Sequence, residues 1–301
     1  MNKLPNLFIV VAEKAATTFL AHNLARHPEI FAPPIKEPQF FSTDVMPKTK
    51  HEKRLWNLPK NRWHIYSHNA FIRDENLYLA LFNEQEPRHR YLLDASTSYL
   101  YSHNAAQRIH RFNPSSKIII SLRNPITRAF SAYKMDLSIG GMRMEFSDAI
   151  RVKRTYLERS LYYRQVKRYF DTFDKSDILI LFFEDIKSDP AEAFRKIFDF
   201  LSLPQIEFKE YEKVNEGTSP RFALLNQLLY SRGIKTMIVE LLPPSIKNLF
   251  KRFYYAKDIA PAIDEDTYRY LLEYFYQDVT NLSTLLGRDL VSYWLENKKE
   301  R

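Results

Sequence analysis

The chain begins with an apolar stretch that leads, after a short polar turn, into a helical pattern. Residues 7–11, LFIVV, are continuous and rich in β-branched side chains, which is typical of a parallel strand buried on both faces. From Thr17, the expected N-cap, apolar positions recur at helical spacing until Pro28 ends the helix. This order leaves unpaired amides at the helix N-terminus, with Lys14 beside them. The stretch therefore predicts an anion-binding site.

The turn around Lys14 is a weak signal when it is taken alone. A lysine and threonines at a helix start are more often a solvated cap than a ligand site. The turn also lacks the glycines of a Walker A loop, because Val11, Ala15 and Ala16 stand near the required positions. The choice between a solvated helix cap and an anion-binding site therefore depends on evidence from other parts of the chain.

Three more apolar segments predict strands that alternate with helical segments. They span residues 91–94, 117–122 and 178–183. Such alternation predicts an α/β fold with a central, mainly parallel sheet flanked by helices. Lys14, residues 94–99 and Arg123 all follow strands, so we expect them at the carboxyl edge of one sheet, where open α/β sheets bind ligands.

Helical patterns fill much of the remaining chain. They cover residues 74–82, the segment from Pro125 onward, and residues 158–173, 190–201, 222–231 and 266–286. Asn124 is the expected cap of the helix that starts at Pro125. The length alone is compatible with one or two domains. Together with the family resemblance given below, it leads us to expect a single domain over residues 1–301, with a core at about 7–231 and a helical C-terminal part at 232–301.

A proline-rich loop follows the first helix. Prolines within residues 30–42 exclude a helix and hold the segment extended. The loop presents Lys36 and Glu37, and a stiff loop is a good mount for a catalytic group. Two exposed loop charges are the simpler alternative.

Composition excludes several kinds of site. The 301 residues are 45% hydrophobic and 15% aromatic, which is enough for a sizeable core. Cysteine is absent, so disulfides, thiolate metal sites and cysteine nucleophiles are excluded, and the histidines lack the short spacings of a metal site. The first apolar run is too short for a signal peptide or a membrane span, so we expect a cytoplasmic protein.

The net charge of +9 indicates an anionic partner without identifying it. The basic residues are dispersed and no nucleic-acid motif is present, so nucleic acid is not expected as a partner. Residues 243–257 mix basic and aromatic side chains and are compatible with an anionic membrane surface. Packing against the chain's own domain is the favoured interpretation of that segment.

Six stretches, in order along residues 7–231, together carry a family resemblance. They are FIVVAEKAATTFL, HPEIFAPPIKEPQFF, LLDASTSYL, KIIISLRNPITRAFSAY, RSLYYRQVKRYFDTF with ILILFFEDIKSDP, and NEGTSPRFALLNQLL. In this order they resemble the sulfotransferases that use 3′-phosphoadenosine 5′-phosphosulfate (PAPS), in particular the branch with bacterial sulfotransferases and heparan sulfate sulfotransferase domains. The resemblance implies a P-loop-like three-layer fold, PAPS as sulfuryl donor, its bisphosphate PAP as product, and no metal.

The resemblance also implies roles for particular residues. The turn after the first strand resembles the loop that grips the 5′-phosphosulfate, and Arg123 with Ser131 resembles the pair that holds the 3′-phosphate. Glu37 is similar in position to the family's proposed general base. The predicted catalytic residues are Glu37 and Lys14, the donor-binding residues are Lys14, Ala15, Ala16, Thr17, Thr18, Arg123, Ser131, Tyr162, Ser219 and Arg221, and the acceptor-binding residues are Lys36, Gln39, Ser96 and Tyr99.

Some positions depart from the family pattern. Val11 and Ala16 stand where many members have glycine, and Ala95 stands where some glycan-modifying members have a lysine that assists the reaction. The missing lysine argues against a heparan-like acceptor. If Glu37 is not the base, the next candidates are His51, His64, His68 and His103. Trp63, Tyr66, Tyr78 and Tyr99 are candidates for an aromatic acceptor cleft, although aromatic residues are more often core.

The resemblance leaves the acceptor open, as a hydroxyl or amine of a glycan, a glycolipid or a small natural product. One alternative function is a P-loop-type kinase, for which Glu184 and Asp185 after a strand would supply the magnesium-binding acids. The other is a non-catalytic binder of anionic glycans or lipids, which would show steep salt dependence.

Overall fold

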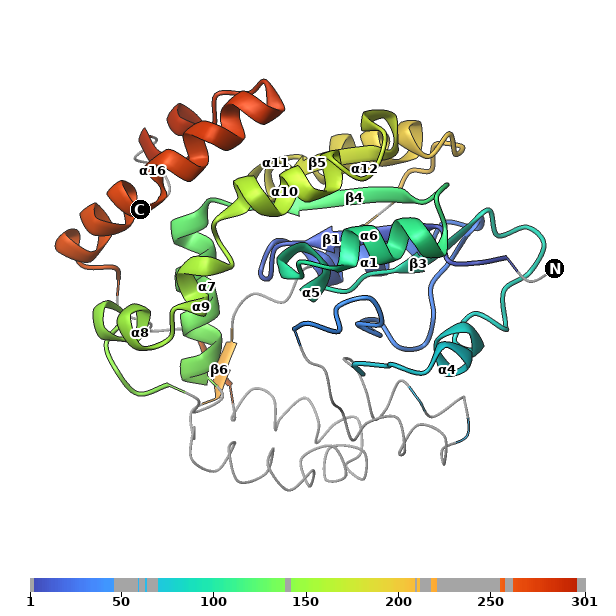
Figure 1. Ribbon diagram of the computed structural model, residues 1–301, viewed down its shortest axis with the longest axis horizontal. Coiled ribbons are helices and arrows are strands. Elements are labelled where there is room, and N and C mark those ends of the chain that lie inside the picture. The colour runs from blue at the N-terminus through green and yellow to red at the C-terminus, as the bar shows by residue number, and fades with distance from the viewer. Residues whose placement is uncertain are drawn as a thin grey trace.

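The computed structural model describes most of the chain, namely residues 3–45, 59, 63, 70–138, 142–208, 210–211, 218–220, 255–257 and 262–296. Its centre is a parallel sheet of five strands in the order β2-β3-β1-β4-β5 (Figure 1). The strands are β1 (Leu7–Val11), β2 (Ile30–Phe31), β3 (Tyr91–Asp94), β4 (Lys117–Leu122) and β5 (Ile178–Phe182). The four strands expected from the apolar segments are confirmed, and β2 is added at one edge.

The sheet is covered on both faces. All five residues of β1 are buried, and successive residues of a strand point to opposite faces. This explains the continuous apolar run, and it confirms the predicted three-layer α/β fold. In register, β1 pairs with β4 along its whole length, from Leu7 opposite Lys117 to Val11 opposite Ser121.

Helices connect the strands and flank the sheet (Figure 1). They are α1 (Thr17–Leu24), α4 (Glu75–Ala80), α5 (Ser98–Tyr101), α6 (Ala105–Phe112), α7 (Pro125–Ser138), α8 (Phe146–Val152), α9 (Thr155–Glu158), α10 (Tyr162–Phe170), α11 (Phe183–Ser188), α12 (Pro190–Phe200) and α16 (Glu265–Leu286). A 3-10 turn spans Lys175–Asp177, and a π-helical segment, η3, spans Val291–Glu296. Within the described ranges, no helix combines the length and apolar character needed to cross a membrane.

The cap of α7 confirms the sequence prediction. Asn124 accepts hydrogen bonds through Oδ1 from the amides of Ile126 and Thr127, at 2.9 and 3.2 Å. By contrast, the helix predicted over residues 158–173 is confirmed only in part, because α9 ends at Glu158 and α10 runs from Tyr162 to Phe170. Between them, Leu161 leaves the helical region with ψ of 86°.

The C-terminal helix α16 matches its predicted range closely. Asp264 caps its first turn by accepting from the amide of Thr267 at 2.8 Å, and Gly287 ends it in the left-handed conformation with φ of 65°. The helix packs against α10 and α7. The predicted helix at residues 222–231 lies outside the described residues, as does most of residues 243–257. Of residues 212–261, the structure describes only the short strand pair β6 (Thr218–Pro220) and β7 (Tyr255–Lys257).

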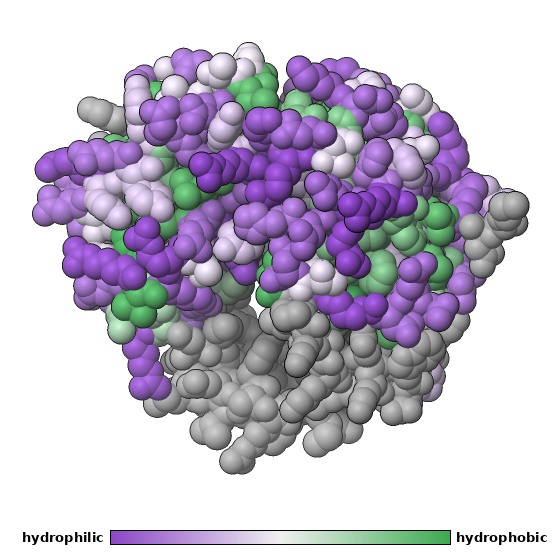
Figure 2. All heavy atoms as spheres, in the orientation of Figure 1, coloured by the Kyte–Doolittle hydropathy of each residue, from purple (hydrophilic) through white to green (hydrophobic). Residues whose placement is uncertain are grey.

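The outer surface is mainly polar in the view of Figure 2, with patches of apolar residues between hydrophilic ones. This agrees with a chain in which 27% of the residues are charged. The carboxyl ends of β1 and β4 point toward α7 and α9 (Figure 1). The residues that follow these strands therefore meet at the carboxyl edge of the sheet, beside α7 and α9 (Figure 1).

The turn between β1 and α1 has an unusual backbone. Ala16, not Thr17, is the N-cap of α1, and it has φ of 70° with no side-chain cap hydrogen bond. Lys14 is also left-handed, with φ of 73°. The turn thus adopts left-handed geometry without glycine, which costs about 1–2 kcal/mol at each such position. Left-handed residues within a turn can direct successive amides toward one anion.

The left-handed alanine provides a test of this backbone. In Ala16→Gly the strain at positive φ disappears, whereas Ala15→Gly removes an equally buried methyl group at a position without positive φ. Both variants gain the same chain entropy when unfolded. We therefore expect the free energy of unfolding of Ala16→Gly to exceed that of Ala15→Gly by about 1–2 kcal/mol. Urea unfolding measures this difference, and equal values for the two variants would contradict the left-handed geometry.

Candidate active site

The turn after β1 and the end of β4 are joined by direct hydrogen bonds. Arg123 donates from Nη1 to the carbonyl oxygen of Lys14 at 3.0 Å, and Ser121 Oγ donates to the carbonyl of Ala15 at 2.8 Å. The guanidinium of Arg123 also lies 4.4 Å from the centre of the Phe183 ring. The structure therefore brings together the two segments in which an anion site was predicted.

The electrostatics of the turn suit an anion. Lys14 is partly buried, and burial lowers the pKa of its ammonium group below the usual value. Glu13 opposes this shift, and the charge of Arg123 adds to it. Glu13 in turn accepts a hydrogen bond from Arg159 at 2.8 Å. Two cations that repel each other beside a helix N-terminus would both be stabilised by a bound anion.

A buried arginine, Arg128, adds to this positive region. Its Nε donates to Ser160 Oγ at 2.6 Å and its Nη2 donates to the carbonyl of Tyr156, but Nη1 has no hydrogen-bond partner among the described residues. Arg128 interacts electrostatically with Arg123, and burial lowers its pKa. Unpaired donors on a buried guanidinium are costly, so this donor set fits a phosphate group.

Arg128 was missed among the predicted binding residues. The available signal was an arginine among the buried positions of α7, where it lies between Ile126 and Ala129 and is fully buried itself. Tyr162, a predicted donor residue, is also fully buried, and burial raises the pKa of its hydroxyl. Its electrostatic interaction with Arg128 places it in the same region.

Glu37 is buried and held by several hydrogen bonds. Its exposed fraction is 6%, so the alternative of an exposed loop charge is wrong. Oε1 accepts from Lys36 Nζ at 2.7 Å. Oε2 accepts from Gln39 Nε2 at 2.9 Å and from Thr97 Oγ1 at 2.7 Å. Thr97, which follows β3, was missed as a site residue because its contact with Glu37 spans 60 residues of sequence.

Lys36 joins Glu37 to the first turn of α1. Its Nζ donates to Thr18 Oγ1 at 3.0 Å as well as to Glu37 Oε1 at 2.7 Å. A single ammonium group therefore links the predicted anion loop to the predicted base. This is the connection that defines the candidate active site.

A buried carboxyl group, Asp94, lies behind Glu37. Its Oδ1 accepts from Ser96 Oγ at 2.6 Å, and its Oδ2 accepts from the hydroxyls of Tyr78 and Tyr99 at 2.9 and 2.7 Å. Ser96 Oγ in turn accepts from the amide of Gln39 at 3.0 Å. Burial raises the pKa of Asp94 to about 6, against the opposing effect of these hydrogen bonds.

Three predicted acceptor-binding residues belong to this interior network. Gln39, Ser96 and Tyr99 are all buried, and their polar atoms bind Glu37 or Asp94 or their neighbours. Their positions are at odds with direct acceptor contact, because they support Glu37 from within the core. Tyr78 and Trp63 are likewise buried, so they do not line an open aromatic cleft.

The other predicted residues are placed as follows. Ser131 lies on α7, partly buried, and β6 with Ser219 packs beside α7. His103 is exposed, and its backbone amide donates to Asp44 at 2.7 Å. Among the predicted site residues, those that lie outside the described ranges are His51, His64, Tyr66, His68 and Arg221.

Glu184 and Asp185 attach the C-terminal segment to the sheet. Glu184 accepts from the amide of Asn124 at 2.8 Å and from Trp294 Nε1 at 3.2 Å, and Asp185 accepts from Arg288 at 2.8 Å. These structural contacts explain the acidic pair better than the magnesium site of a kinase. Across the described ranges, no three His, Asp or Glu side chains are grouped so that they could hold a metal ion.

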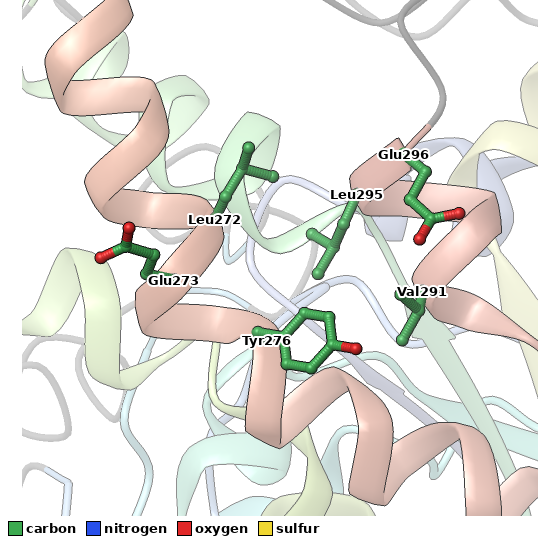
Figure 3. A pocket seen from close by; sticks show the side chains of 6 residues that line it. All are labelled: Leu272, Glu273, Tyr276, Val291, Leu295 and Glu296. Carbon is green, nitrogen blue, oxygen red and sulfur yellow. The ribbon is translucent and has the colours of Figure 1, made fainter.

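An apolar hollow of about 270 Å³ lies elsewhere, between α16 and η3 (Figure 3). Its lining consists of Leu272, Glu273, Tyr276, Val291, Leu295 and Glu296. None of these residues follows β1, β3 or β4, so the hollow is separate from the candidate active site.

Comparison with known proteins identifies the family of this chain. A family model described as "Sulfotransferase family" matches residues 5–207, so the chain belongs to the sulfotransferase family. The crystal structure of a sulfotransferase from Alicyclobacillus acidocaldarius superposes with a TM-score of 0.68 at 28% identity, covering 97% of this chain and 99% of that one. A sulfotransferase domain from the curacin biosynthetic pathway, at 16% identity and a TM-score of 0.52, covers 95% of this chain and 99% of that one and shares the fold.

Curated relatives match over a smaller share of their own length. Human heparan sulfate glucosamine 3-O-sulfotransferase 6 is 28% identical over 130 residues, which are 38% of this chain and 36% of that protein. Human carbohydrate sulfotransferase 15 is 23% identical over 257 residues, covering 69% of this chain and 45% of that protein. The chain thus spans less than half the length of either relative.

The raised pKa of Asp94 predicts a pH dependence of stability. Between its ordinary value of 3.8 and about 6, the folded protein keeps a proton on Asp94 that the unfolded chain releases. This contribution is therefore complete below pH 4 and is lost as the pH rises through 6. This contribution is absent in Asp94→Asn. Between pH 4 and pH 7, the free energy of unfolding of the variant should therefore rise by about 2 kcal/mol relative to that of wild type.

Urea unfolding of both proteins across this pH range measures the effect, since carboxylates common to both cancel in the difference. Asp278→Asn should show a pH-dependent gain in unfolding free energy of the same sign, because burial raises the pKa of Asp278 to about 6 as well. Parallel pH profiles for wild type and Asp94→Asn would show that Asp94 titrates normally.

Proposed function

We propose that this protein transfers the sulfuryl group of PAPS to a hydroxyl or amine of a glycan, a glycolipid or a small natural product. The observation that carries the proposal is the link from Thr18 through Lys36 to Glu37, which places a buried carboxylate next to an anion-binding helix start. Membership of the sulfotransferase family supports the reaction type.

The donor would be held at the carboxyl edge of the sheet. Lys14 and the amides at the start of α1 suit the 5′-phosphosulfate, which supplies the activated sulfuryl group. Arg123, Ser131 and the unpaired Nη1 of Arg128 suit the 3′-phosphate. Charge builds on the departing oxygen during sulfuryl transfer, and a lysine held in the turn, Lys14, would stabilise that charge without reorganisation. Tyr162, Ser219 and Arg221 remain proposed donor residues.

Glu37 is the proposed general base. A carboxylate is a weak base for an alcohol in the ground state, but it becomes effective when the proton leaves within the transition state. Gln39 and Thr97 fix the direction of Oε2, and the ammonium group of Lys36 donates a hydrogen bond to Oε1. Such fixed orientation lowers the entropy cost of reaching the reactive geometry.

The alternative functions receive less support. A P-loop kinase requires a glycine-rich loop, and here the turn contains Lys14, Ala15 and Ala16 instead. A passive binder of anionic glycans has no use for a buried glutamate held by three donors. The acceptor class is proposed from the relatives, two of which are named for heparan sulfate or carbohydrate. Ala95, in place of an assisting lysine, favours an acceptor unlike heparan.

Nucleotide binding is the first test of the donor. With adenosine 3′,5′-bisphosphate (PAP) at a hundred times its dissociation constant, the protein should gain about 2.7 kcal/mol, a rise in melting temperature of a few degrees. ATP with magnesium should give no comparable rise, and Arg123→Ala should lose the response to PAP. A response to ATP with magnesium alone would favour the kinase, and a response to neither would favour a glycan or lipid binder.

Substitution of the two catalytic candidates tests the mechanism. Lys14→Ala and Glu37→Gln should each lower turnover by about a hundredfold or more, because one removes a transition-state cation and the other the base. Only Lys14→Ala should also weaken PAP binding. Matched controls are Lys196→Ala and Glu192→Gln, an ion pair on the outer side of α12. Near-normal turnover in Glu37→Gln would remove Glu37 from the mechanism.

A further inference from the structure

Asn124 is the centre of a hydrogen-bond network that reaches the C-terminal segment. Its backbone amide donates to Glu184 Oε1 at 2.8 Å, and its Nδ2 donates to the carbonyl oxygen of Trp294 at 2.6 Å. Its Oδ1 caps α7, as described above. All three polar groups are therefore engaged, and only 2% of the residue is exposed.

Trp294 closes the network from the other side. Its indole Nε1 donates to Glu184 Oε2 at 3.2 Å, so the two oxygens of Glu184 bind Asn124 and Trp294 separately. The indole ring also lies 6.1 Å from the ring of Tyr162 and 5.6 Å from that of Phe182. Trp294 is 1% exposed and comes from η3, 170 residues after Asn124.

The residues next to this network form the proposed phosphate site. Arg123 precedes Asn124, and its guanidinium lies over Phe183, which precedes Glu184. Arg123 Nε also donates to Thr127 Oγ1 at 3.1 Å, in the helix turn that Asn124 caps. Phe183 and Glu184, which follow β5, thus contact Arg123 and Asn124, which follow β4.

We propose that Glu184, through Asn124 and Trp294, is a positioning residue that fixes Arg123 for the 3′-phosphate of the donor. This inference rests on the proposed function. The carboxylate oxygens bind the amide of Asn124 and the indole of Trp294, so the proposed role of Glu184 is indirect. It acts by fixing the backbone from which Arg123 extends, so its loss should weaken recognition of one phosphate and leave the rest of the nucleotide site unaffected.

Asp185 provides a second, separate attachment of the C-terminal segment. Asp185, the next residue, accepts from Arg288 at 2.8 Å and from the hydroxyl of Tyr293. Arg288 also lies over the Phe182 ring at 4.1 Å. Asp185 therefore attaches the same segment to the end of β5 through contacts that do not include Asn124, which makes it a matched control.

The test compares two nucleotides that differ in the 3′-phosphate. Affinities for PAP and for adenosine 5′-monophosphate are measured by calorimetry in wild type, Glu184→Gln and Asp185→Asn. The preference for PAP should fall about tenfold in Glu184→Gln, the effect of one hydrogen bond to a charged group. In Asp185→Asn both affinities should keep their wild-type ratio. Glu184→Asp, which restores the charge on a shorter side chain, should recover part of the preference.

Each outcome decides a separate point. An unchanged preference in Glu184→Gln would overturn the positioning role while the donor site stands. An equal fall in Glu184→Gln and Asp185→Asn would show that both residues act only by docking the segment. If wild type itself has no preference for PAP, the proposed function and this inference both fail. Should Glu184→Gln not fold, Trp294→Phe removes the indole donor, and the same fall in preference is expected.

Discussion

The pairing of β1 with β4 is the constraint on which the site depends. Because Val11 lies opposite Ser121, the chain leaves both strands at the same level, and the next residues of each meet. The hydrogen bonds from Ser121 to Ala15 and from Arg123 to Lys14 follow from this register. A shift of one residue would reverse every side chain of a strand and separate the two turns. Core packing and the geometry of the proposed donor site therefore require the same alignment.

Burial of charge characterises the rest of the site. Glu37, Asp94 and Arg128 are all within 6% of complete burial, where a charge without partners would be very costly. Glu37 is compensated by neighbours on two loops, whereas Nη1 of Arg128 has no hydrogen-bond partner among the described residues. The structure thus distinguishes a carboxylate that is fully hydrogen-bonded from a guanidinium that has one donor left over.

Much of this architecture could be predicted from local patterns, and the failures have physical causes. Continuous apolar runs predicted four strands, and Asn124 followed by Pro125 predicted the start of α7, because these signals act within a few residues. Thr17 was wrongly expected to cap α1, since no pattern showed that Ala16 would adopt positive φ. The predicted helix over residues 158–173 is interrupted before Tyr162, where Ser160 binds Pro125 and Arg128 instead.

The candidate site likewise contains residues that could be predicted from the sequence and residues that could not. Lys14, Glu37 and Arg123 could be singled out because each stands at a recognisable strand end or stiff loop. The supporting roles of Thr97 and Arg128 could not, because they arise from contacts between segments that are distant in sequence. Sequence alone also left Glu37 as a plausible surface charge. Glu37 is buried because the loop after β3, which carries Thr97, packs beside it, and this contact spans 60 residues of sequence.

The attachment of Asn124 to Trp294 has a consequence for the order of synthesis. The sheet strands are all made before residue 183, so the domain core can begin to form while the chain is still on the ribosome. Trp294 is made 170 residues after its partner, so Asn124 lacks that contact while those residues are synthesised. Under the proposed role of Glu184, the phosphate site would therefore mature later than the sheet. A nascent chain would acquire its fold well before it could discriminate between nucleotides.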